Sequence, residues 1–339
     1  MVKCWQKEPI ETANAAGSGC NHRGTMLWRI SVGIWLILTC TLLHAGQDSS
    51  GVAVIYPDVG EPYRSVFTQV INGIKQQINS PVAVYPVTQS IEISDLNAQL
   101  KHSGARVVIA LGRQGLAAIV GLDHSIAVVA GGVISVPDAD KHSVMGITGI
   151  SLTPDPALLF ARLKALMPNA KKVIVIYDPQ NNESLIRLAS HAAQEQGLEL
   201  EAHPAGNLAT AVRLYDAAFS AADGRHDAIW LPQDDTTVDE EIVIPLVLKN
   251  AWARDVPVFS SSLLHVRKGV LFALYPDNIE LGRNLALTAQ NVIKTGLRSS
   301  GMTPLQTVLL AVNLRTASHI GLNFSYQQQR GFDLVFPEP

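Results

Sequence analysis

Short apolar runs alternate with longer amphipathic stretches from Gly51 onward. The apolar runs, which are rich in valine and isoleucine and are predicted to be strands, occupy 52–57, 82–87, 107–112, 127–133, 172–178, 198–205, 227–232, 256–261 and 270–275. Helical patterns occupy 62–78, 93–102, 113–121, 155–167, 182–196, 207–222, 239–253 and 277–296. Continuous rather than alternating apolarity is typical of parallel strands that helices cover on both faces. The pattern therefore predicts an α/β protein.

The strand–helix rhythm breaks between Val133 and Lys171. A polar stretch and one predicted helix fill the gap, and the rhythm starts again at Val173. The chain has 339 residues, which suits two domains at about 150 residues each. We therefore expect two α/β units, with the crossover between them in this gap.

The first 45 residues read as a targeting segment rather than as part of the fold. Arg29 precedes an apolar stretch, Ile30–Leu43, which is too short for a comfortable membrane span and is followed by a small residue, Ala45. We expect export with cleavage after Ala45 and a periplasmic location, and Met26 is a possible true start. A lipoprotein modified at Cys40 and an uncleaved anchor are the alternatives.

Composition narrows the function classes. All three cysteines precede Ala45, so thiol chemistry and disulfides are excluded from the predicted mature chain. That chain carries 22 basic and 27 acidic residues and no basic tract, which argues against a nucleic-acid partner. Dinucleotide, phosphate-loop, zinc-protease and serine-hydrolase motifs are missing, and the histidines lack paired metal spacing. We expect no enzyme activity, no cofactor and no metal.

Polar residues gather where the predicted strands end, which is where open α/β sheets bind ligands. The candidate ligand-binding residues are Tyr56, Asp58, Gly112, Arg113, Gln114, Asp178, Gln233, Asp234, Ser260, Ser261, Tyr275 and Asp277. The pair Gly112 and Gly115 at a helix start can offer bare N–H groups to a carboxylate, or can serve only a tight turn. Asp178 and the serines also have a plain reading as turn and loop residues.

Asp277 lies at a junction between a buried strand and a long helix. With Glu280 three residues later, it resembles a capping box, in which the Asp side chain accepts hydrogen bonds from the first helical N–H groups. A ligand contact is the other reading. The two are compatible, because one carboxylate oxygen can face the helix while the other faces outward.

Four segments together resemble one family, the type I periplasmic substrate-binding proteins of ABC transporters, and within it the branch that includes tryptophan/tyrosine-uptake proteins. The segments are a strand leading into Asp277, Glu280, Leu281 and Gly282; residues 145–184 with Thr148-Gly149, Pro168-Asn169-Ala170 and Tyr177-Asp178-Pro179; residues 227–238 with Pro232 and Asp234; and residues 312–322. The resemblance covers nearly the whole predicted mature chain.

The resemblance implies two doubly wound parallel-sheet lobes joined by a hinge that the chain crosses three times. Lobe 1 would hold 48–149 and about 277–304, and lobe 2 about 150–276 and 305–339. It also implies that Asp234 and Asp277 meet the ammonium group of an amino-acid-like ligand. Tyr56, Tyr275 or Trp230 could stack on its side chain, although core packing is the plainer reading of the mid-strand Trp230.

The implied partners are a small polar organic molecule and an ABC permease, with the protein a monomer. The alternative is a periplasmic sensor subunit for a membrane signalling protein, which the sequence does not separate from transport. Gln233 stands where the family has Thr, Asp235 is an additional acid, and Pro137 precedes Asp138 in a loop where the family usually has Asp-Pro. These departures fall at expected pocket positions, so tryptophan is not carried over as the ligand.

Overall fold

The computed structural model describes residues 50–88, 93–135, 146–296 and 301–337. The predicted export segment, with Met26 and Cys40, lies outside these residues, as do Pro137 and Asp138. Among the helices that are described, none combines the length and apolarity needed to cross a membrane.

The first sheet has six strands, all parallel, in the order β11-β5-β4-β3-β1-β2. Its strands are β1 (Val52–Pro57), β2 (Ala83–Val87), β3 (Val107–Leu111), β4 (Ala127–Val133), β5 (Thr148–Pro154) and β11 (Gly301–Leu305). Its helices are α2 (Tyr63–Gln77), α3 (Ile93–His102), α4 (Gly112–Ile119) and α11 (Asn278–Thr295). We call this sheet and these helices lobe 1.

Strand β1 shows why the apolar runs are continuous. Its side chains alternate between faces, as in any strand. Ala53 and Ile55 pack in the cluster that includes α3 and α4, whereas Val52 and Val54 pack in the cluster that includes α2 and α11. Both faces of the sheet are therefore covered by helices, and every position of the strand core needs an apolar residue.

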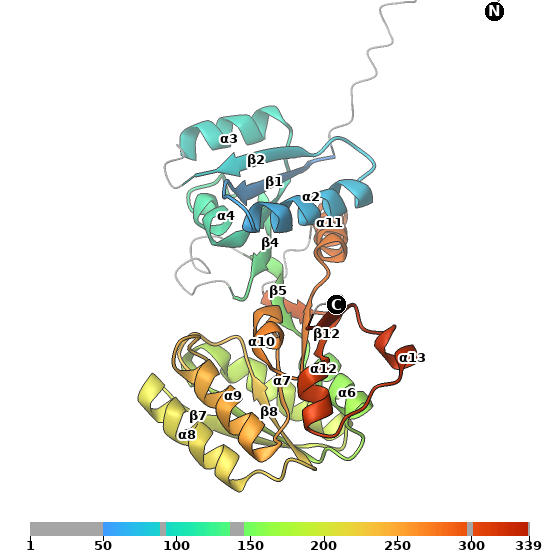
Figure 1. The fold of residues 1–339 in the computed structure, drawn as a ribbon. Helices are drawn as coiled ribbons and strands as arrows, with labels where there is room; N and C mark the ends of the chain where they lie inside the picture. The colour runs from blue at the N-terminus through green and yellow to red at the C-terminus, as the bar shows by residue number, and fades with distance from the viewer. Residues whose placement is uncertain (1–49, 89–92, 136–145, 297–300, 338–339) are drawn as a thin grey trace, which may run out of the picture. The chain divides into compact units, whose positions relative to one another are not determined.

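Helices α2 and α11 lie side by side on one face of lobe 1 (Figure 1). Two glycines allow this approach. A Cβ added at Gly73 would lie 2.0 Å from the carbonyl oxygen of Ile279, and one added at Gly282 would lie 2.0 Å from that of Val70. The two backbones therefore touch where each helix has no side chain, and Gly282 of the Glu-Leu-Gly segment has a packing role.

The second sheet has seven strands in the order β13-β12-β10-β9-β8-β6-β7. Its strands are β6 (Lys172–Tyr177), β7 (Glu199–Pro204), β8 (Asp227–Leu231), β9 (Val258–Ser260), β10 (Phe272–Pro276), β12 (Val308–Asn313) and β13 (Leu334–Phe336). Its helices are α6 (Pro156–Leu166), α7 (Pro179–Glu195), α8 (Leu208–Ala221), α9 (Val243–Arg254), α10 (Leu263–Lys268), α12 (Leu314–His319) and α13 (Tyr326–Gln329). We call this set lobe 2. The sheet is parallel except that β12 runs antiparallel to β10.

Lobe 2 has the same three layers. One core cluster joins the sheet to α6 and α7, and the other joins its opposite face to α8 and α9. Trp230 of β8 is fully buried, and its ring meets Phe160 edge-on with 5.7 Å between centroids. The plainer reading of Trp230, as a core residue, is the one that these contacts support.

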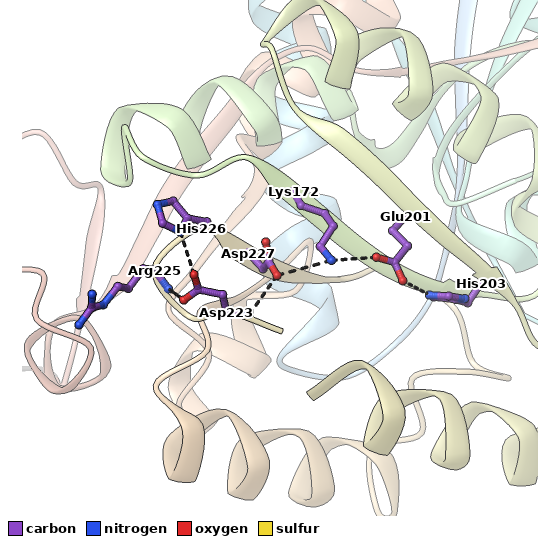
Figure 2. A network of polar contacts seen from close by, with 7 residues as sticks. All are labelled: Lys172, Glu201, His203, Asp223, Arg225, His226 and Asp227. Carbon is purple, nitrogen blue, oxygen red and sulfur yellow. Dashed lines mark hydrogen bonds and ion pairs between the residues drawn. The ribbon is translucent and has the colours of Figure 1, made fainter. Parts of the chain in front are cut away.

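A polar network joins β6, β7 and β8, three neighbouring strands of lobe 2 (Figure 2). The Lys172 ammonium lies 3.0 Å from Glu201 and 3.5 Å from Asp227, and Glu201 also lies 2.8 Å from the His203 ring. Asp227 in turn accepts a bond from the N–H of Asp223. Lys172 and Asp227 lie at the amino ends of β6 and β8, opposite to the strand ends that carry the candidate residues.

Six described elements, α10, β11, β12, α12, α13 and β13, were not predicted from the sequence, and three others differ from the prediction. Residues 148–154, read as part of a crossover, form β5, because β4 and β11 on either side supply its hydrogen bonds. The helix expected at 182 begins at Pro179, because Asp178 caps it with Pro at the first turn. The helix expected at 239 begins at Val243, because the Asp239 carboxylate holds the preceding residues in a turn.

Three chain segments connect the two sheets, as the triple crossing implies, and they are bonded to one another. The N–H of Asp155 donates to the carbonyl of Leu305 at 3.0 Å, and the Gln306 amide donates to the Asp155 carboxylate at 2.7 Å. The N–H of Asp277 donates to the carbonyl of Thr307 at 3.3 Å. The exact lobe boundaries stay a prediction.

Candidate functional site

The strand orders identify one switch point in each sheet, between β1 and β3 in lobe 1 and between β6 and β8 in lobe 2. Chain connections leave such a pair of strands in opposite directions, which opens a crevice at their carboxyl ends where open α/β proteins bind ligands. Of the predicted residues, Tyr56 lies near the carboxyl end of β1, Asp58 and Gly112–Gln114 follow β1 and β3, and Asp178, Gln233 and Asp234 follow β6 and β8.

At the lobe 1 switch point, backbone geometry decides which side chains fit. Gly112 has φ +70°, a conformation that favours glycine. A Cβ there would also lie 3.0 Å from the Phe67 ring and 3.2 Å from Pro57. Gly112 therefore serves a tight turn, and it also begins α4, whose first turn carries no acidic residue. Both readings of this glycine pair remain compatible with the geometry.

The side chains around this turn differ in exposure. Asp58 and Arg113 are exposed, and Tyr56 is half-buried. Gln114 holds its amide oxygen in a buried position with no hydrogen-bond partner among the described residues. A buried acceptor without a donor costs about 1–3 kcal/mol, so this oxygen is a place where a ligand donor would be favoured.

Asp234, at the lobe 2 switch point, is only 7% exposed. One carboxylate oxygen accepts bonds from the N–H of Asp178 at 2.7 Å and the amide of Asn182 at 3.0 Å. The other accepts from the N–H groups of Thr236 and Thr237 at 2.9 and 3.0 Å. A carboxylate has about four acceptor sites, and four internal donors occupy them. The predicted ammonium contact stays a prediction, and it would require one of these donors to leave.

Asp178 has a similar internal role. One oxygen caps α7 by accepting from the N–H of Gln180 at 2.9 Å. The other accepts from the Asn181 amide at 2.8 Å and the Thr236 hydroxyl at 3.1 Å. Asp178 and Asp234 thus fasten the ends of β6 and β8 to each other, and sequence reasoning found both residues but missed the surrounding donors Asn182 and Thr236.

Gln233 and Ser261 lie together beside this network. The Gln233 amide donates to the backbone carbonyl of Ser261 at 3.3 Å and accepts from the Thr153 hydroxyl at 3.1 Å. The Ser261 hydroxyl is buried and, within the described chain, has no hydrogen-bond partner. Of the two adjacent serines, Ser261 is therefore the one whose hydroxyl makes no hydrogen bond within the described chain, and a ligand would reach it only after the surrounding groups move, because the residue is 2% exposed.

Ser260 is committed elsewhere. Its hydroxyl lies 2.7 Å from Nδ1 of His265 and accepts from the N–H of Ser262. Nε2 of His265 lies 2.8 Å from a carboxylate oxygen of Glu240. Burial lowers the pKa of His265. Ser260 is 1% exposed, so no substrate atom reaches its hydroxyl in this structure. The spacing of Ser260, His265 and Glu240 along the sequence does not predict these contacts.

Asp277 does cap its helix, as one of the two sequence readings expected. A single oxygen, Oδ1, accepts from the N–H groups of Ile279 and Glu280 at 3.1 Å each. In a capping box, the Glu280 side chain would also accept a hydrogen bond from the backbone N–H of Asp277. Here Glu280 pairs with Arg283 instead. Oδ2 of Asp277 has no hydrogen-bond partner among the described residues, and the residue is half-buried. The second oxygen therefore remains available.

Tyr275 lies two residues before Asp277 and is half-buried. Burial raises the pKa of its phenol, and the nearby Asp333 and Asp277 carboxylates add to the shift. The ring is therefore neutral at physiological pH and can offer an O–H donor or an apolar face. Together, the carboxyl-end residues provide acceptors, hydroxyls and one uncommitted carboxylate oxygen, which suit ligand binding.

Comparisons with known proteins agree with this architecture. The family model described as "ABC transporter substrate binding protein" matches residues 85–325. No curated protein sequence matches the chain. A ligand-free, open substrate-binding protein with adhesive properties from Clostridium difficile is similar, at 15% identity and a TM-score of 0.58, over 84% of this chain and 98% of that one.

Two further solved structures are similar over 84% of this chain and 99% of theirs. One is an ABC domain in complex with L-Trp from Streptococcus pneumonia, at 17% identity and a TM-score of 0.53. The other is a conserved domain protein from Vibrio cholerae, at 18% identity and a TM-score of 0.52. These likenesses confirm the predicted two-lobed, type I periplasmic-binding-like fold. Because the family model spans more than half of the sequence, the chain belongs to the ABC transporter substrate-binding protein family.

Proposed function

We propose that the protein is the extracytoplasmic solute-binding subunit of an ABC transporter and that it binds a small amino-acid-like zwitterion between its lobes. The observation that carries the proposal is Asp277, whose Oδ1 caps α11 while Oδ2 remains without a partner among the described residues. A half-buried carboxylate oxygen of this kind favours a cationic group, because a charge-assisted hydrogen bond is stronger than a neutral one.

Other groups support the proposal that the ligand also carries a carboxylate. The first turn of α4 carries no acidic residue, and its backbone N–H groups form a suitable partner for a carboxylate. The Gln114 amide oxygen and the Ser261 hydroxyl, both buried and without a partner among the described residues, would add an acceptor and a donor at strand ends of the two lobes once a movement exposes them. Closure of the lobes about the three bonded connections would bring these groups onto one ligand. We expect Asp234 and Asp178 to shape this site rather than to bind the ligand.

The test is calorimetry of the protein against the twenty amino acids and a set of small polar metabolites. Asp277→Asn keeps the capping oxygen and removes the charge, so we expect the Kd of the best ligand to rise at least tenfold, by about 1.4 kcal/mol or more. Asp239→Asn is the matched control, because one Asp239 oxygen likewise accepts two consecutive N–H groups, at 3.0 and 2.7 Å, and these come from Glu241 and Ile242, which are not candidate residues. Equal affinities for the wild type and Asp277→Asn would refute the site assignment.

Transport itself needs a second measurement. We expect the ligand-loaded protein to stimulate ATP hydrolysis by its permease–ATPase complex in proteoliposomes, and Asp277→Asn to need more ligand for the same rate. Ligand binding without any such stimulation, together with capture of a membrane receptor, would assign the protein to sensing instead.

A further inference from the structure

A second concave site lies in lobe 2 and includes none of the candidate residues discussed above. It is a cavity of about 690 Å³ formed by α9, α10, the start of α12 and the end of β13. The side chains that decide its chemistry are Lys249, Trp252, Arg267, Lys268, Arg315 and Phe336. Its volume falls in the range of about 300–1,000 Å³ that is usual for small-molecule sites.

The lining is strongly cationic. Two lysines and two arginines contribute to it, and none of the described lining residues is acidic. Lys268 is paired with Glu240 outside the lining. Lys249 and Arg315, by contrast, have no ion pair within the described part of the chain. Like charges gathered in a concavity raise the local positive potential, which draws in anions.

Aromatic rings hold two of the cations in place. The Arg315 guanidinium lies 5.7 Å from the centroid of the Trp252 ring, and the Arg267 guanidinium lies 5.6 Å from that of Phe336. Trp252 is in turn stacked on His319 at 3.5 Å with an interplanar angle of 6°. The Arg315 guanidinium, oriented in this way, loses less freedom when it binds, and its planar donors match a carboxylate or phosphate group in a bidentate manner.

We propose that this cavity is a second ligand site, for a small organic polyanion that carries at least two carboxylate or phosphate groups. More than one anionic group is required because Lys249 and Arg315, the two lining cations without an ion pair in the described part of the chain, come from separate elements, α9 and α12. The site is independent of the proposed zwitterion site, where Asp277 favours a positive charge. The two sites therefore select ligands of opposite character.

The test is calorimetry at low ionic strength with citrate and with inorganic pyrophosphate as probes and acetate as the monoanion control. We expect saturable one-to-one binding of at least one polyanion, with affinity that falls as salt is added. Binding of citrate alone would assign the site to carboxylates, and binding of pyrophosphate alone to phosphates. Acetate should bind at least tenfold more weakly, because its single carboxylate can reach only one of the separated cations Lys249 and Arg315.

Arg315→Gln should weaken polyanion binding about tenfold or more, since it removes one charge-assisted bidentate partner. Arg213→Gln on α8 is the matched control, because Arg213 bonds only Thr210 among the described residues and its loss changes the net charge equally. Lys249→Gln provides a second cavity variant if Arg315→Gln does not fold. Asp277→Asn should leave polyanion binding unchanged.

Three results would overturn the proposal. The first is the lack of saturable binding of either polyanion by the wild type. The second is an equal loss of affinity in the Arg213 and Arg315 variants, which would indicate general charge attraction. The third is binding of an acidic peptide such as oligo-glutamate without binding of either small anion, which would make the cavity a contact for a protein partner.

Discussion

Replacing Asp234 by alanine should destabilise the protein severely, because the carboxylate organises four donors in a buried place. Three of those donors belong to residues that are buried: the N–H of Asp178, the amide of Asn182 and the N–H of Thr237. The fourth, on Thr236, can reach water because that residue is only half-buried. The substitution therefore leaves three buried donors without an acceptor.

The magnitude follows from those three donors. A buried polar group left without a partner costs about 1–3 kcal/mol, so the lower part of that range gives a loss of about 3–5 kcal/mol. Domains are stable by only about 5–15 kcal/mol, so this is a large fraction of the total. Asp234→Asn should cost less, because the amide keeps one acceptor oxygen but turns an NH₂ group toward two donors.

Urea unfolding followed by circular dichroism, with a thermal melt beside it, measures the effect. The melting temperature should fall by about 10 °C, at about 2–4 °C per kcal/mol for a protein of this size. Asp235→Ala, a neighbouring and exposed acid, should change the free energy of unfolding by less than about 0.5 kcal/mol. The reasoning fails if Asp234→Ala keeps wild-type stability and yet loses the ligand, since the oxygens would then serve the ligand and not the scaffold.

Three further predictions concern other parts of the fold. Gly282→Ala should destabilise the protein by about 1–3 kcal/mol or more, because the added Cβ would overlap the backbone of the facing helix. Gly206→Ala should be neutral, because a Cβ there would have no atom within 4 Å. Equal melting temperatures for the two variants would contradict the close helix contact. The hydrogen bond from Lys172 lowers the pKa of Glu201. The free energy of unfolding of the wild type should therefore exceed that of Lys172→Met by about 0.5–1 kcal/mol above pH 4.5. Urea titrations should show this difference decreasing as the pH falls below 4.5. A difference that persists undiminished at pH 3 would exclude this linkage. Burial lowers the pKa of His265, so wild-type stability should decline as pH drops below 6.5 while His265→Gln shows a flatter profile; parallel profiles would remove His265 as the cause.

Most of the strands were predictable because their positions are fixed by burial on both faces. Ala53 and Ile55 face one helical layer while Val52 and Val54 face the other, so the apolar run is visible without any structure. Strand β5 was not predictable in this way, because TGISLTP carries polar residues and takes its hydrogen bonds from β4 and β11. Nor could periodicity give the reversed direction of β12, since strand direction depends on its neighbours.

In the candidate site, the positions of the residues were predictable from the sequence, but their roles were not. The strand-end positions of Asp178, Asp234 and Asp277 could be located because a strand followed by a capping acid has a local signature. Their tasks differ because of partners that are distant in sequence. Asp234 receives donors from Asp178 and Asn182, more than fifty residues away, whereas Oδ2 of Asp277 receives none from the described residues.

The sequence by itself determined the α/β class, the break between two units, the family resemblance and the strand ends where polar residues gather. These depend on local periodicity and on short capping and turn patterns, which a chain carries in consecutive residues. Only the tertiary structure decided which carboxylate is saturated and which is uncommitted, and only it brought Lys249, Arg267 and Arg315 around one cavity. Hydrogen-bond saturation and local potential arise from residues that meet in space, so no window of sequence contains them.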